Sequence, residues 1–271
     1  MPSPSISIIM PFYNPGEYLR EAIDSILSQS FADFEFLILN DGSTDDSESM
    51  VLSYRDERIR YLRNDRNRGL VYTLNRGLDE AVAPLIARMD ADDIALPDRL
   101  QKQVEYLRAH PEADLVAGVV ELMDAQGKPM GFWKEDHEHA APDAIQAFLA
   151  SNNCIAHPTV LAKAEPFRIL RYRAEQGDAE DYDLWLRWIS AGYTIHKLPE
   201  VLLKHRILPG SFTRLRQQNV YFKLAATKWR FVTHEISHRR FNDFTLMTGL
   251  MILGDITKGL GKGIKKLLQA S

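Results

Sequence analysis

The chain has 271 residues, of which 45% are hydrophobic and 26% charged, and a formal net charge of −4. These values match an ordinary globular protein that is long enough to bury a sizeable core. The single cysteine, Cys154, excludes an internal disulfide and favours a reducing compartment. The N-terminus lacks a basic region followed by a long apolar run, so we expect no secretory signal.

The first hundred residues alternate between two patterns. Short apolar runs predict strands, and apolar residues at helical spacing predict the helices between them. The predicted strands are 5–10, 34–40, 58–63 and 84–89, and the predicted helices are 15–29, 41–54 and 69–81. This alternation predicts a parallel sheet with helices on both faces. In such sheets, ligands bind beyond the carboxyl ends of the strands.

After residue 97 the pattern changes to mixed α and β. The predicted helices are 97–111, 142–150 and 181–192, and the predicted strands are 113–124 and 128–135. No linker, internal repeat or low-complexity segment interrupts the chain. We therefore expect one continuous domain over residues 1–213, followed by an extension at 214–271.

Polar segments stand at three predicted strand ends: PFYN at 11–14, NDGS at 40–43 and DADD at 90–93. The clustered carboxylates of the third segment can hold a hard divalent cation, which prefers oxygen ligands. The competing interpretation is a loop of solvated aspartates that caps the next helix. For the second segment, Asp41 can accept a hydrogen bond from a base or ribose, or it can belong to a group of helix-capping residues.

A fourth acidic segment, GDAEDYDLWLRW, begins the predicted helix at 181–192. Glu180, Asp181 and Asp183 stand where the helix dipole favours negative charge, which explains one or two of them structurally. A catalytic base would need its carboxylate to face the same crevice as the metal. Periodicity does not decide this.

Together these segments resemble the family-2 glycosyltransferases over about residues 5–213. The resemblance rests on six blocks in order: SIIMPFYN, ILNDGSTDDS, RNRGL, ARMDADD with PDRLQKQ, AHPTV, and AEDYDLWLRW. It implies an α/β fold of the GT-A type, a Rossmann-like three-layer α/β/α sandwich, here with a helical C-terminal extension. It also implies transfer of a sugar from a nucleotide-sugar, most often a UDP-sugar, with inversion at the anomeric carbon.

The resemblance also implies residue roles. It places a set of residues at the nucleotide-sugar: Pro11, Tyr13, Asn14, Asp41, Arg88 and Asp90. Within this set, Asp41 would accept from the uracil ring and Asp90 would contact the ribose. Asp92 would bind the divalent metal, Mn²⁺ or Mg²⁺, that bridges the two phosphates.

For catalysis, the resemblance implies that Asp181 is the general base, because an inverting displacement needs a carboxylate to take the acceptor proton. Glu180 would orient Asp181 or touch the acceptor. His157 would touch one of the substrates, or would equally be a satisfied core histidine.

One segment departs from the family pattern. Relatives commonly read YRxHPGS after the last core strand, and their histidine can complete the metal site, whereas this chain reads HRILPGS. Leu208 holds the place of that histidine and cannot ligate a cation. His205 stands where tyrosine is usual and could approach the metal from another angle. Lys204 and Arg206 could still neutralise phosphates.

The extension is basic. Residues 214–271 contain 11 Lys and Arg and 3 Asp and Glu, a net charge of +8, so the remainder carries −12. Its apolar stretch is too short to span a bilayer. A cationic amphipathic helix can lie on an anionic membrane surface. The alternatives are packing on the catalytic domain and a contact between two copies.

We therefore expect an inverting, metal-assisted glycosyltransferase of surface polysaccharide synthesis. It would be cytoplasmic or peripheral on the inner face of the cell membrane. Its partners would be a UDP-sugar and a saccharide or lipid-linked acceptor, with a homo-oligomer as an open option and no nucleic acid. The alternative is a non-catalytic sugar-nucleotide or glycan-binding module that kept the fold. The reason to consider it is Leu208, which cannot ligate a metal.

Overall fold

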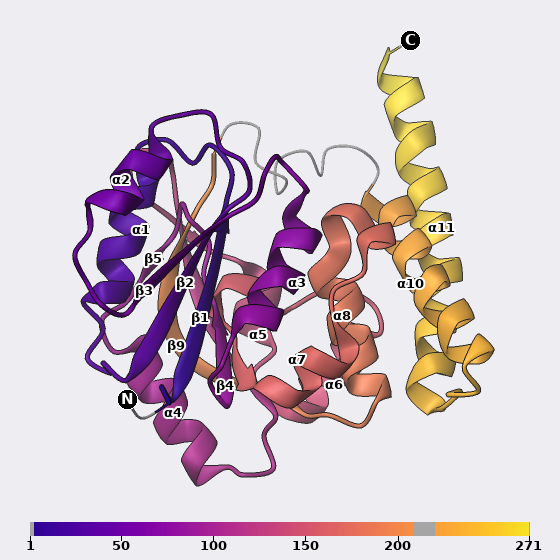
Figure 1. Ribbon diagram of the computed structural model, residues 1–271. Helices are drawn as coiled ribbons and strands as arrows, with labels where there is room; N and C mark the ends of the chain where they lie inside the picture. Colours follow the sequence, from indigo (N-terminus) through magenta and orange to yellow (C-terminus); the bar gives the residue numbers. More distant parts are fainter. Residues whose placement is uncertain (1–2, 209–219, 271) are drawn as a thin grey trace.

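In the computed structural model, a nine-stranded sheet lies between helices, and the residues described are 3–208 and 220–270 (Figure 1). Four parallel strands make one half of the sheet, in the order β3-β2-β1-β4. Their bounds are β1 Ile6–Phe12, β2 Phe34–Asn40, β3 Ile59–Arg63 and β4 Leu85–Arg88. These are the four strands that the apolar runs predict.

The other half of the sheet is mixed, so the expectation of a parallel sheet holds only for the first four strands. Here β8 lies antiparallel between β4 and β6, β9 runs parallel to β6, and β5 pairs antiparallel with β9, while β7 pairs with β6. The bounds are β5 Ile94–Ala95, β6 Leu115–Met123, β7 Pro129–Phe132, β8 Leu161–Lys163 and β9 Ile195–Arg206. Helices still separate most of these strands along the chain, and only β6 and β7 follow each other directly, as an antiparallel pair can.

Helices cover both faces of the sheet because successive strand residues point to opposite sides. Along β1, Ile6, Ile8 and Met10 pack in the core layer that contains α1, α2 and α4, whereas Ile9 packs in the layer that contains α3 and α8. The first layer contains α1 Tyr18–Leu27, α2 Ser47–Ser53 and α4 Arg99–Ala109. The second contains α3 Leu70–Glu80, α6 Pro142–Leu149, α7 Ala164–Leu170 and α8 Glu180–Ser190. The three layers are those of the predicted sandwich.

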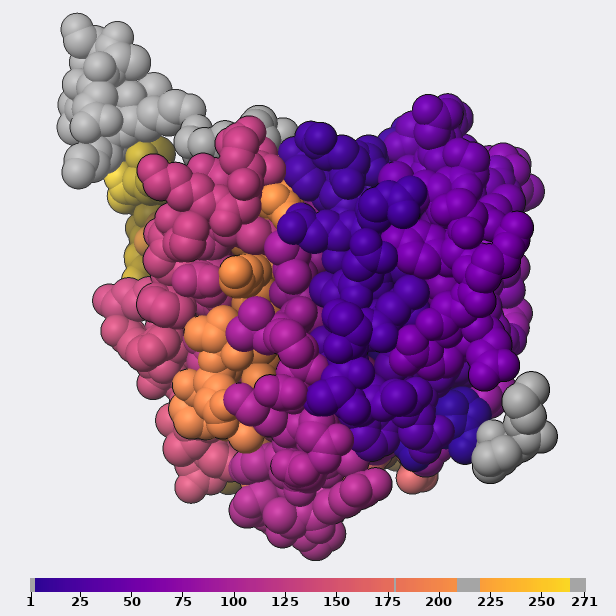
Figure 2. Space-filling model, turned by 90° about the vertical axis from the view of Figure 1, so that its left-hand side faces the viewer, coloured from indigo at the N-terminus to yellow at the C-terminus, as the bar shows by residue number. Residues whose placement is uncertain are grey.

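Long-range pairing brings distant segments together. Figure 2 shows residues of β9, in orange, at the surface between the indigo N-terminal segment and a magenta segment from the middle of the chain.

Short elements fill the connections between the strands and helices. They are α5 Lys134–Glu138 and the 3₁₀ turns His157–Thr159 and Ala174–Ala179. The predicted strand at 128–135 therefore ends at Phe132, and a helix follows it.

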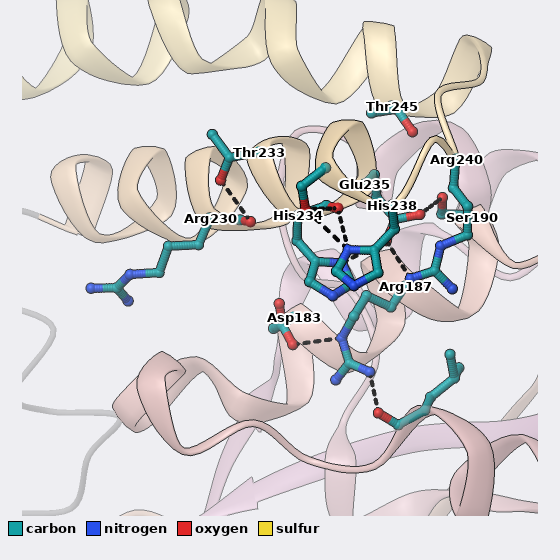
Figure 3. A network of polar contacts seen from close by, with 12 residues as sticks. Asp183, Arg187, Ser190, Arg230, Thr233, His234, Glu235, His238, Arg240 and Thr245 are labelled. Carbon is teal, nitrogen blue, oxygen red and sulfur yellow. Dashed lines mark hydrogen bonds and ion pairs between the residues drawn. The ribbon is translucent and has the colours of Figure 1, made fainter.

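The extension forms two helices, α10 Val220–Ser237 and α11 Asp243–Ala270, which pack against each other and against α8. Phe231 of α10 and Phe244 of α11 lie in the same core cluster as Trp185 and Trp188 of α8. Polar contacts reinforce this packing. The Ser190 hydroxyl donates to the Glu235 carboxylate at 2.7 Å in the network of Figure 3.

The boundary that the sequence predicts between 213 and 214 lies outside the described residues. In the described part of the chain, every helix is too short or too polar to cross a membrane.

Candidate functional site

The loop after β2 is organised by Asp41, which is buried at the strand end. Its carboxylate accepts hydrogen bonds from the Asn64 side-chain amide at 2.7 Å and from the backbone N–H groups of Arg68 and Gly69, both at 2.9 Å. A carboxylate has about four acceptor positions, so one remains for a ligand. Gly42 is required next to it, because a Cβ there would lie 2.4 Å from the Arg66 carbonyl carbon.

The loop after β1 is tied to the same place by Asn14. Its side-chain oxygen accepts the Thr44 N–H at 2.8 Å, and its own N–H donates to the Ser43 hydroxyl at 3.0 Å. Tyr13 is 48% exposed beside it. Pro11, by contrast, is buried within β1, in register with Leu39 of β2. The structure therefore brings Tyr13, Asn14 and Asp41 together at one edge of the sheet, with Pro11 below the surface.

The loop after β4 carries the three aspartates. Asp93 is completely buried, and its carboxylate accepts from the His205 Nδ1 at 3.0 Å and from the Arg206 N–H at 2.9 Å. Asp90, Asp93 and His205 each offer a ligand atom, and these atoms lie within 4.8 Å of one another. Two carboxylates and an imidazole suit Mg²⁺ or Mn²⁺. His205 thus brings an imidazole to the acidic loop from β9, although Leu208 has replaced the family's histidine.

Asp92 lies outside that group of three but within its electrostatic field. Burial, and then the charges of Asp93 and Asp90, raise the pKa of Asp92 to about 7. A divalent cation would relieve this repulsion between carboxylates, so the residues present fit a metal. Arg206, considered above for phosphates, is engaged elsewhere. Its guanidinium donates to the Asp92 carbonyl at 2.9 Å and pairs with the Glu21 carboxylate.

Arg88 lies on β4 below this loop. Its guanidinium pairs with the Asp90 carboxylate, and its side chain is 5% exposed. Two of its nitrogens, Nε and Nη1, are buried and have no hydrogen-bond partner among the described residues. A buried donor without a partner costs about 1–3 kcal/mol. This arrangement suits a ligand oxygen that would accept from the guanidinium.

The start of α8 faces the same crevice. Arg88 and Asp90 are close enough to Glu180 for their charges to act on its pKa, which burial and then the Asp181 charge raise to about 8. Asp181 accepts a hydrogen bond from the Asn153 side-chain amide at 3.0 Å. The charges of the two acidic segments, 90 residues apart in sequence, therefore act on each other and on Arg88. The role of Asp181 as the base stays a prediction.

Two neighbouring residues, Asp183 and His157, are buried and have partners inside the protein. Asp183 is buried and pairs with Arg187 at 2.8 Å, one turn along α8 (Figure 3). His157 is buried, and its Nε2 lies 2.8 Å from the Tyr172 hydroxyl. Burial, together with the Arg88 charge, holds the pKa of His157 well below its usual range, so its ring is neutral. His157 thus has a satisfied side-chain contact at the wall of the crevice.

A cleft of about 1060 Å³ opens beside these acids. One wall is α3 with its preceding loop, including Arg68 and Tyr72, and the other is the segment 171–180, including Tyr172 and Glu180. The Arg68 and Gly69 amides that line one end are those that Asp41 holds. The cleft therefore runs from the loop that Asp41 holds to Glu180 at the start of α8, and its volume is about that of the largest small-molecule sites.

The sequence pattern of the family described as "Glycosyl transferase family 2" matches residues 7–153. The chain belongs to this glycosyltransferase family. An uncharacterised glycosyltransferase of Methanocaldococcus jannaschii is 32% identical over 86% of this chain and 82% of its own. The O-antigen biosynthesis glycosyltransferase WbnJ of Escherichia coli is 34% identical over 74% of this chain and 79% of its own.

Solved structures with the same fold include a fragment of TarS from S. aureus in complex with UDP-GlcNAc. Its TM-score is 0.68 at 17% identity, and the match covers 84% of this chain and 66% of the TarS fragment. The mannosyltransferase PcManGT of Pyrobaculum calidifontis, in complex with GDP-Man and Mn²⁺, gives 0.66 at 17% identity over 97% of this chain and 76% of its own. The prediction of a GT-A fold is thereby confirmed.

Proposed function

We propose that this glycosyltransferase transfers a sugar from a UDP-sugar, with inversion, to a saccharide or lipid-linked saccharide in surface polysaccharide synthesis. One observation carries the proposal: Glu180 lines a cleft of about 1060 Å³ and lies within the electrostatic reach of Arg88 and of Asp90 in the acidic loop. The names of WbnJ and of the putative teichuronic acid glycosyltransferase TuaG of Bacillus subtilis support the choice of pathway.

The donor would lie along the carboxyl ends of β1, β2 and β4. Tyr13 and Asn14 would contact the base, and Asp41 would use its remaining acceptor position for an N–H of the ring. Asp90 would contact the ribose. Arg88 Nε and Nη1, which have no hydrogen-bond partner among the described residues, would donate to oxygens of the diphosphate or sugar, because a guanidinium matches such oxygens well. The UDP-GlcNAc and GDP-Man bound to TarS and PcManGT support a nucleotide-sugar in general.

A divalent metal would be held by Asp92 together with the group of Asp90, Asp93 and His205. When bound, it would stabilise the charge that develops on the leaving nucleoside diphosphate. PcManGT, solved with Mn²⁺, supports Mn²⁺ as the first metal to test.

Asp181 would take the proton of the attacking acceptor hydroxyl as general base. The hydrogen bond from Asn153 holds its carboxylate in place. Glu180, whose pKa of about 8 keeps it mostly protonated at pH 7, would donate a hydrogen bond to the acceptor or to the donor sugar. An acceptor in the cleft would approach both carboxyl groups from the side of Tyr72 and Tyr172. We place this reaction in the cytoplasm, at the inner face of the cell membrane.

A donor screen with UDP- and GDP-sugars, with and without Mn²⁺, tests the proposal. We expect release of UDP from one UDP-sugar in the presence of Mn²⁺, and loss of turnover with chelator. Asp181→Asn should lower transfer by about 10²–10⁴-fold while UDP affinity, measured by calorimetry, stays within about twofold. Asp183→Asn is the matched control for a nearby acid outside the crevice and should affect stability first.

The competing function, a non-catalytic binding module, predicts a different outcome. It requires UDP binding without turnover of any donor, in the wild type as in Asp181→Asn. The argument for this function was that Leu208 replaces a metal-binding histidine. The contact between His205 and Asp93 weakens that argument, because an imidazole still reaches the acidic loop.

A further inference from the structure

The outward face of α11 is apolar between Leu246 and Leu260. Large side chains recur there at helical spacing, and each is 37% to 67% exposed: Leu246, Leu250, Leu253, Ile256 and Leu260. From the first to the last they span about 21 Å at 1.5 Å per residue. Isolated exposed leucines are ordinary on a protein surface, but a continuous apolar stripe indicates an interaction site.

The opposite face of α11 already has its partners. Phe244, Ile252 and Gly259 are buried against the rest of the protein, and Phe222 of α10 lies against Gly259. Asp255 is buried in an ion pair with Lys228. The helix therefore packs on the domain with one side and exposes a second apolar side, a pattern that packing on the domain alone does not require.

Two apolar side chains of α10 are exposed as well: Trp229 and Ile236. They are seven residues apart, so they lie on one side of the helix. Trp229 is 62% exposed. Tryptophan is enriched where an apolar phase meets water, as at the surface of a bilayer. We refer to the exposed apolar residues of α10 and α11 together as the outer face of the hairpin.

The exposed charges of the two helices have one dominant sign. Within residues 220–263, the exposed acidic side chain is Asp243, because Glu235 and Asp255 are buried. The exposed basic side chains are Lys223, Arg230, Arg239, Arg240, Lys258 and Lys262. Each basic residue near an anionic lipid surface adds about 1 kcal/mol of attraction.

We propose that the outer face of the hairpin binds an anionic lipid bilayer, with the leucines of α11 and Trp229 entering its interfacial layer. A second copy of the chain fits less well, because a two-fold contact would set the same basic residues against each other. An anionic bilayer instead complements both the apolar stripe and the positive charge.

The orientation of the hairpin suits such a partner. In Figure 1 the N-terminus lies close to the start of β1, and the C-terminal end of α11 reaches beyond the domain at the opposite end. That is the end toward which the parallel strands run and at which the candidate site lies. A bilayer bound along the outward face of α11 would lie beside the domain, on the side away from α8. Lipid binding does not rest on the proposed function.

Sedimentation with vesicles of equal parts phosphatidylglycerol and phosphatidylcholine tests the proposal on the full chain. We expect the wild type to sediment with these vesicles and to remain in solution with pure phosphatidylcholine or at high salt. The double variant L250E/L253E should bind at least about tenfold more weakly. L52E, at an exposed leucine of α2, is the matched control and should bind like the wild type.

A second variant, K258E/K262E, removes charge without touching the apolar stripe, and should weaken binding to the anionic vesicles. Circular dichroism and UDP binding of all variants should match the wild type, which separates this test from the test of glycosyl transfer. Wild-type protein that stays in solution with anionic vesicles would overturn the proposal. So would a dimer in analytical ultracentrifugation that L250E/L253E dissociates, since the outer face would then bind a second copy.

Discussion

Glu180 and Asp181 are neighbours in the chain, yet the fold gives them different surroundings. Glu180 is buried and shares the crevice with Arg88 and Asp90, whereas Asp181 is partly exposed and accepts from Asn153. Burial disfavours the charged form of a carboxyl group, which is why the pKa of Glu180 is raised. Two adjacent acids can thus act as a hydrogen-bond donor and a proton acceptor at the same pH.

This difference predicts the pH dependence of transfer. Glu180 is protonated below its pKa of about 8, so its hydrogen bond is present at neutral pH and is lost as the pH rises through that value. The rate of transfer in wild-type protein should therefore fall above about pH 8. Glu180→Gln keeps a donor that does not titrate, so its pH–rate profile should lose this alkaline limb. An unchanged limb in the variant would assign the titration to another group.

The positions of the acidic segments at strand and helix ends were predictable, because each stands beside a pattern of strand or helix that fixes its place along the chain, while the roles of these acids stay predictions. The motifs were not sufficient to predict the contact between His205 and Asp93. These residues are 112 positions apart and meet only because β9 pairs with the two-residue strand β5. Likewise, Arg88 Nε and Nη1 lack hydrogen-bond partners among the described residues because the side chain is buried. The sequence around Arg88 does not show that burial.

At the scale of elements, the strongest tie within the hairpin is the ion pair between Lys228 of α10 and Asp255 of α11. The two atoms lie 2.6 Å apart, and the Lys228 side chain is fully buried. Burial lowers the pKa of Lys228, and the contact with Asp255 counteracts this. A buried pair need not stabilise a fold, but removal of one partner leaves the other charge uncompensated.

Lys228→Met should therefore lower the free energy of unfolding by about 3–5 kcal/mol, measured by urea titration with tryptophan fluorescence. The double variant Lys228→Met with Asp255→Leu should recover most of that loss, because both charges are then replaced by apolar groups. If the double variant is as unstable as the single one, the ion pair itself stabilises the hairpin and the desolvation argument is wrong for this site.

Elements were predictable where a long apolar run or a clear helical period exists. The first four strands, α1, α3 and α8 are of this kind. Strands β8 and β5 were not predicted, because they are three and two residues long and leave no readable alternation. No bounds were predicted for β9, because Pro199 and several charged residues interrupt its apolar pattern and its middle is exposed. Strands β8 and β9 form through long-range pairing with β6, and β5 forms through pairing with β9, and not through local preference.

At the scale of the whole molecule, the extension and the catalytic part share one core. Phe231 and Phe244 pack in the cluster that contains Trp185 and Trp188 of α8. The net charges of −12 and +8 predicted two surfaces with different partners, because charged residues mostly face solvent. These charges carry no information on the inward faces of α10 and α11, whose packing depends on their apolar residues.

Truncation after residue 213 should consequently destabilise the protein. Loss of the burial around Phe231 and Phe244 should lower the melting temperature by roughly 10 °C or more, measured by differential scanning calorimetry. L250E/L253E is the control, because it alters the exposed side of the hairpin and should leave the melting temperature unchanged. A truncated protein as stable as the full chain would support the sequence-based boundary at 213 as a true domain limit.

Lys228 also connects the hairpin with the reacting groups. Besides Asp255, its ammonium donates to the Ser151 carbonyl at 2.6 Å. Two residues further along, Asn153 donates to Asp181 at 3.0 Å. The path from α11 to the proposed base thus consists of one ion pair, two hydrogen bonds and a stretch of backbone from Ser151 to Asn153. The hairpin therefore supports the segment that holds the Asp181 carboxylate, in addition to presenting a surface.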